Sequence, residues 1–143
     1  MAIFNLGMLG FSLGALARGV QAAARNSAVY TSAQFTSSKA FVTPSCATTV
    51  GYFNSAVSPP LPAAGTSVGS NPLLSISWTN NAGSTVGSYP PGVILTLTGS
   101  YSWVPFGFDG LFSGIPLKIS TVATVMGTAG TTSTITITAA SCS

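Results

Sequence analysis

The first forty residues carry a hydrophobic pattern that differs from the rest of the chain. An almost unbroken apolar run covers residues 1–17, and residues 18–40 then mix small apolar residues with polar ones. Apolar and small residues recur at helical spacing, and the first proline is Pro44. The pattern predicts one long helix over about residues 3–35, apolar all round in its first half and amphipathic in its second. Such a helix requires burial in a membrane or among other helices.

Glycines at Gly7, Gly10, Gly14 and Gly19 interrupt this helix. A glycine in a helix interior costs about 1 kcal/mol relative to alanine, and the usual reason to tolerate it is close approach between helices. We therefore expect many copies of this helix to bundle together; a single membrane anchor with incidental glycines is the alternative. The large residues expected to fill the spaces between neighbouring helices are Phe4, Leu6, Met8, Leu9, Phe11, Leu13 and Leu16.

After a polar junction at residues 37–43, ended by Pro44, apolar and polar residues alternate as they do in strands. We expect strands at about residues 43–53, 73–79, 93–104, 117–126 and 131–139. In the second of these, Leu74, Ile76 and Trp78 alternate with serine and threonine, which predicts one buried face and one wet face. Gly99 is expected to mark a bulge in the third. The threonine-rich last strand suits a sheet edge.

The connections between these strands are rich in glycine, proline and asparagine. Residues 55–72 read as an irregular surface loop, and residues 80–92 as a long turn. The aromatic segment 106–112 is expected to fold under the sheet or against a neighbouring subunit. The fold class predicted is α+β: an N-terminal hydrophobic assembly helix over residues 1–40, then a small antiparallel β-rich head domain over residues 41–143.

Charge is scarce in this chain: 3% of residues are charged, against about 25% in an ordinary globular protein. A soluble monomer needs charge to stay dispersed, so we expect the surface to be covered by copies of the chain, by membrane or by attached sugar. The net charge of +3 is too small and scattered for a nucleic-acid footprint, so no nucleic acid is expected as partner. The charged residues are Arg18, Arg25, Lys39, Lys118 and Asp109.

This inventory argues against catalysis. The chain has no histidine and no glutamate, and its one acid is Asp109. No pair of carboxylates, Ser–His–Asp set or ordinary zinc site can be built from it. The composition permits a Ser–Lys dyad through Lys39 or Lys118, but the sequence near either lysine does not indicate a turn that would present a nucleophile. We expect no enzyme, no metal and no cofactor.

The two cysteines, Cys46 and Cys142, lie far apart in the sequence. A bridge between them would tie the C-terminus to the junction after the helix, and closing a loop of about 100 residues contributes up to about 4–5 kcal/mol on the chain-entropy model. The low charge and the abundant serine and threonine favour an oxidising compartment and the disulfide; two buried free thiols are the alternative.

The N-terminus lacks the features of an ordinary signal peptide, because no basic residue precedes the apolar run and no small-residue cleavage site ends it. We expect either that a leader has already been removed or that the helix is itself the export signal.

Residues 22–30 resemble the Ala-Ala-Arg-x-x-Ala-x-Tyr signature in the helix of TadE-like pilins, in the tight-adherence branch of the type IV pilus superfamily. The runs 93–105, 110–112 and 117–123 are similar to that family's C-terminal part, where a strand ends in an aromatic–proline step, a hydrophobic loop follows and a second strand ends in small residues. The resemblance covers the helix and the central hairpin but not residues 55–72 or the last strand.

The resemblance implies a pilus (fimbrium) subunit: the helix is stored in the inner membrane, then extracted by pilus assembly machinery into the core of an extracellular helical filament that serves cell adhesion or surface attachment. Pilins of the superfamily usually carry glutamate at the fifth mature position. This chain has Asn5 there, and hydrogen bonding by Asn5 in the filament core is the corresponding hypothesis. A membrane-anchored surface protein that never polymerises and a viral or virus-like coat protein are the alternatives.

The charged side chains leave two further questions open. Arg18 and Arg25 either face solvent or lipid headgroups, or bond to polar groups of neighbouring subunits in the outer layer of an assembled core. Asp109 either pairs with Lys118 or a neighbouring arginine, or caps its own turn. Because no Asn-x-Ser/Thr acceptor is present, any glycosylation would be O-linked.

Overall fold

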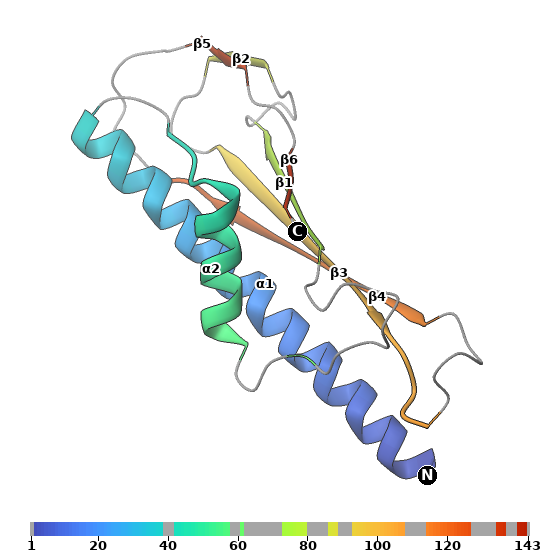
Figure 1. The fold of residues 1–143 in the computed structure, drawn as a ribbon. Coiled ribbons are helices and arrows are strands. Elements are labelled where there is room, and N and C mark those ends of the chain that lie inside the picture. The colour runs from blue at the N-terminus through green and yellow to red at the C-terminus, as the bar shows by residue number, and fades with distance from the viewer. Residues whose placement is uncertain are drawn as a thin grey trace.

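A computed structural model describes residues 2–38, 42–57, 61, 73–79, 86–88, 93–107, 114–126, 134–136 and 140–142. Helix α1, Ala2–Ser38, runs the length of the molecule (Figure 1). It confirms the helix predicted over residues 3–35 and ends, as expected, ahead of Pro44. With a small antiparallel sheet beside it, the chain has the α+β fold that the sequence predicted.

The main sheet is four-stranded and antiparallel, in the order β4-β3-β1-β6. Its strands are β1 (Leu73–Thr79), β3 (Ile94–Trp103), β4 (Ile115–Thr124) and β6 (Ala140–Cys142). Strand β1 has the predicted bounds, and β3 and β4 agree with prediction to within about two residues at each end. Pro116 lies in β4, where an edge position tolerates its missing N–H.

The strand predicted at residues 43–53 is wrong, because this segment forms most of helix α2, Cys46–Ala56. Its start has a capping signal: the Ser45 hydroxyl accepts a hydrogen bond from the backbone N–H of Thr48 at 3.2 Å. Thr49 and Phe53 are buried at the four-residue spacing of one helical face. The cap outweighs the strand preference of the aromatic residues around Phe53.

Two further predictions need correction in the second half of the chain. The long turn predicted over residues 80–92 contains a short strand, β2 (Val86–Ser88). Within the predicted last strand, the described residues form β5 (Thr134–Thr136), which pairs with β2 in a separate two-stranded sheet and not with the main sheet. Strand β6, which the sequence did not predict, takes the sheet edge beside β1 instead.

Helices α1 and α2 cover one face of the main sheet (Figure 1), and α1 contacts both β3 and β4. The alternation in β3 is regular, with every second residue from Leu95 to Trp103 buried toward the helices. The expected bulge at Gly99 is wrong, because the register with both neighbouring strands continues through it. Helices and strands thus share one hydrophobic core, which joins the helix segment and the head.

The opposite face of the sheet carries short polar side chains. Thr96, Thr98 and Ser100 of β3 are half-buried, and Ser120 and Thr124 of β4 are exposed. The Thr98 and Ser120 hydroxyls lie 2.8 Å apart across the two strands. In β1, Ser75 is exposed and Ser77 and Thr79 are half-buried, which confirms the wet face predicted for that strand.

Candidate functional site

An exposed stripe follows α1 from its start to beyond its middle. Its members recur at intervals of three and four residues, so they lie along one side of the helix. The first half of the stripe is apolar or glycine, and the second half is polar. The stripe consists of Ile3, Gly7, Gly10, Gly14, Arg18, Gln21 and Arg25, all exposed.

The three glycines of the stripe have open space around them. At Gly7, Gly10 and Gly14, a Cβ atom would have no neighbour within 4 Å outside the helix's own backbone. Exposed large side chains flank them, among them Phe11 and Leu13. These glycines therefore make no packing contact with the described part of the subunit, and their side of the helix can approach another surface closely.

Two residues expected to take part in assembly lie inside the subunit instead. Leu16 is fully buried beneath the sheet, next to Gly99. Gly19 is covered by the end of α2, where the side chains of Phe53 and of Val57, the residue that follows the helix, would each come within 2.5 Å of an added Cβ. The close helix approach at Gly19 is therefore made within the chain, to helix α2, which replaces the strand predicted at residues 43–53.

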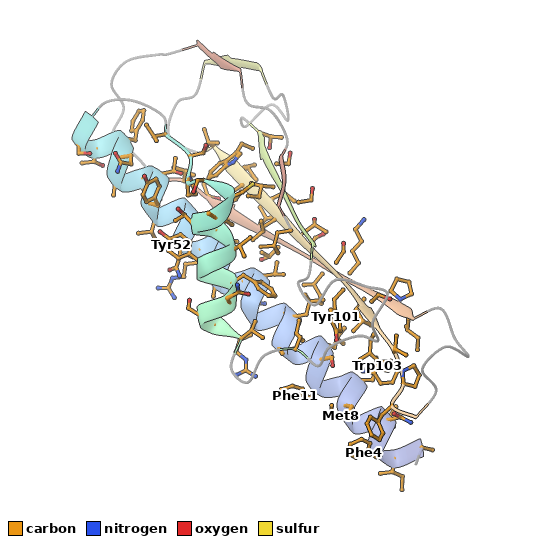
Figure 2. All side chains as sticks on the ribbon, in the orientation of Figure 1. Phe4, Met8, Phe11, Tyr52, Tyr101 and Trp103 are labelled. Carbon is orange, nitrogen blue, oxygen red and sulfur yellow. The ribbon has the colours of Figure 1, made fainter. Side chains whose placement is uncertain are left out.

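Near its N-terminal end, α1 contacts the turn that follows β3 (Figure 2). The Asn5 Oδ1 accepts a hydrogen bond from the backbone N–H of Phe106 at 2.9 Å, and its Nδ2 donates to the Phe106 carbonyl at 3.5 Å. The Phe4 and Phe106 rings meet edge to face, with centroids 6.0 Å apart. Phe106 thus lies against α1 and not under the sheet; residues 108–112 of the predicted aromatic loop are outside the described residues.

A groove runs between the second half of α1 and the edge strand β4. Its volume is about 470 Å³, and its walls are Gln21, Ala24, Arg25, Ala28, Val29 and Ser32 on the helix and residues 121–124 with Met126 on the other side. The Ser32 hydroxyl accepts a hydrogen bond from the Met126 backbone N–H at 3.1 Å. Arg25 is the one charged residue among these lining residues. The groove offers small apolar walls and one cation.

Arg18, Arg25 and Lys118 are exposed, so each cation faces outward from the subunit. Asp109, proposed as a partner for Lys118, lies outside the described residues, as does Lys39. Within the described part of the chain, no group of three histidine, cysteine or acidic residues could hold a metal ion.

The pKa of Tyr101 is raised from its ordinary value because burial disfavours the phenolate.

Cys46, at the first position of α2, is disulfide-bonded, and no described cysteine is free. The sequence contains one other cysteine, Cys142. Strand β6, which includes Cys142, contacts α2. The backbone arrangement thus brings together the two segments that the predicted bridge would join.

The helix segment Ala2–Ser37 is long and apolar enough to cross a membrane, judged by length and composition alone. Comparison with protein-family models, with curated proteins and with solved structures gives no match to this chain.

Proposed function

We propose that this chain is a structural subunit of an extracellular helical filament, a TadE-like pilin, in which the α1 helices of many copies pack together and the β-rich head lies outside. The observation that carries the proposal is the exposed half-stripe of Ile3, Gly7, Gly10 and Gly14. No described residue occupies the space beside Gly7, Gly10 and Gly14, and glycines on an apolar helix face allow another helix to approach closely.

Three further features support the proposal. The described surface carries few charges, so little repulsion opposes the packing of many copies. Strand β4 is an edge of the described sheet and leaves one side open for docking. The apolar helix also meets the length and composition needed for storage in a membrane before assembly. Adhesion or surface attachment and the use of pilus assembly machinery follow from the family resemblance.

A membrane-anchored surface protein that never polymerises is the second candidate, because the same helix would serve as its anchor. Electron microscopy of material sheared from cells that express the chain separates the two. A uniform fibre composed of this chain is the expected result. Recovery only as a detergent-soluble monomer would overturn the filament proposal, and nuclease-protected nucleic acid in the fibre would favour a coat protein.

A further inference from the structure

The groove between α1 and β4 exposes large apolar side chains. Val29 of the helix is 60% exposed, Val122 of the strand 62% and Met126 78%, and all three line the groove. Exposed apolar side chains that gather in one place mark a surface that another molecule covers. The groove therefore presents an apolar surface that the described part of the subunit leaves open.

One charge lies in this apolar groove. Arg25 is exposed and is the one charged residue among the groove's lining residues. The described residues include no acidic side chain, so none of them can neutralise this cation. An ion pair is stronger in apolar surroundings than in open water. The groove thus fits an apolar segment that carries one acid.

The chain itself contains one segment of this composition. Asp109 is the one acidic residue of the sequence, and it stands among apolar residues and glycine in the run Phe-Gly-Phe-Asp-Gly-Leu-Phe, residues 106–112. The structure describes the first two residues of this run, and Asp109 lies outside the described residues. Each copy therefore offers one groove with one cation and one segment with one acid, which suits a repeated contact between like copies.

Asp109 cannot reach the groove of its own subunit. The Phe106 backbone is held at the start of α1, because its N–H donates to the Asn5 Oδ1 at 2.9 Å. Arg25 lies twenty residues later in the same helix, which places it about 30 Å further along the axis. The three residues from Phe106 to Asp109 span at most about 11 Å when extended. The remaining gap of about 19 Å is longer than an arginine and an aspartate side chain together. Only Asp109 of another copy can meet Arg25.

We propose that the groove is an assembly contact between copies: the segment that carries Asp109 on one copy docks in the groove of the next, with the Asp109 carboxylate on the Arg25 guanidinium. This inference rests on the filament proposal and adds a second contact to it. Because the contact joins two unlike surfaces, it can pass from copy to copy in an open-ended helical assembly. For parallel copies it sets the axial offset between contacting subunits at about 20–40 Å.

Charge reversal tests the ion pair. Arg25→Asp and Asp109→Arg should each lower the filament yield in the sheared cell-surface fraction about tenfold, and the double variant should recover to within about twofold of the wild type. Arg18→Asp is the matched control, because Arg18 is exposed on the same side of α1 but does not line the groove. Asp109→Arg should not rescue Arg18→Asp, although that double variant also keeps the net charge of the wild type.

Chemical cross-linking tests the contact between copies directly. Because no described cysteine is free, single variants Arg25→Cys and Asp109→Cys can be joined by a short bismaleimide, which spares the native disulfide. The two variants are expressed together with an excess of the wild-type chain, so that filaments still form. Covalent dimers should appear only when both variants are present. Arg18→Cys with Asp109→Cys is the control pair and should give no dimer.

The outcomes separate this contact from the filament itself. If the wild-type chain yields no fibre, the filament proposal fails and this contact fails with it. If fibres form but the Arg25→Asp variant assembles normally, or the cysteine pair gives no dimer, the groove contact is wrong and the filament proposal survives. If Asp109→Arg rescues Lys118→Asp and not Arg25→Asp, the acid pairs with Lys118, which also overturns the groove contact.

Discussion

Gly99 of strand β3 lies directly beneath Val20 of α1. A Cβ atom at Gly99 would come within 2.5 Å of the Val20 Cγ2 atom and 3.2 Å of the Leu16 Cδ1 atom. Both helix side chains are fully buried, and a valine in a helix has one strongly preferred rotamer, so neither can move aside cheaply. The absent side chain at Gly99 sets how closely the helix approaches the sheet.

Substitution Gly99→Ala should therefore destabilise the subunit by about 1–3 kcal/mol through overpacking. Urea unfolding of the detergent-solubilised chain measures the change. Gly51→Ala is the matched control, since Gly51 lies in helix α2 with no neighbour within 4 Å of its Cβ position. The Gly51→Ala variant should gain up to about 1 kcal/mol of unfolding free energy, because alanine has the higher helix propensity. A Gly99→Ala variant as stable as the wild type would contradict the close approach.

The contact between α1 and α2 leads to a second prediction. Gly19→Ala should lower the unfolding free energy by about 1–3 kcal/mol, because the added methyl group would overlap Phe53 and Val57. Gly14→Ala, earlier in the same helix and open to solvent, should be neutral or slightly stabilising. The same unfolding measurement applies to both. Equal effects of the two substitutions would show that α2 does not lie over Gly19.

The exposed glycine face can be tested without disturbing the fold. Gly10→Leu adds a side chain where no described residue lies within 4 Å of the Cβ position, so the unfolding free energy should stay within about 1 kcal/mol of the wild-type value or rise. Filament yield in the sheared cell-surface fraction should fall severalfold, because close helix approach is blocked. Normal filament yield from this variant would remove the main support for helix packing through this face.

The cysteine pair leads to a prediction on thiol reactivity and stability. The oxidised chain should lack reactive thiols even when unfolded, and Cys142→Ser should release one reactive thiol at Cys46. The variant should lose up to about 4–5 kcal/mol of unfolding free energy on the chain-entropy model. Thiol titration in denaturant and urea unfolding check these two expectations. A wild-type chain that reacts at two thiols would contradict the bridge.

Stability should depend on pH in one alkaline window. No histidine or glutamate is present and Cys46 is disulfide-bonded, so from about pH 5.5 to 9 the described side chains contribute little change. Burial raises the pKa of Tyr101 above its unfolded value of about 10. Above that pH the unfolded chain releases the phenol proton while the folded chain retains it, and stability falls as pH rises toward the folded pKa. The fall should be smaller in Tyr101→Phe, and parallel profiles would exclude this tyrosine as the cause.

Local patterns in the sequence determined much of this protein. Alternation set the faces of β1 and β3, because period two places every second side chain on the same side of any sheet. The apolar run and the absence of proline before Pro44 determined the position and length of α1. The segment 43–53 is a helix and not the predicted strand, because Ser45 caps the start of α2; a serine directly before a helical segment is an N-cap signal that the sequence contains.

Only the tertiary structure decided which glycines serve which contact. Gly7, Gly14 and Gly19 look alike in the sequence, yet Gly19 lies beneath α2 while the other two face open space. The contact of Asn5 with Phe106 also joins residues far apart in the sequence, as does the groove between α1 and β4. Periodicity assigns a side chain to a face of its own element, but what meets that face depends on how the elements pack, and this packing is set by long-range contacts.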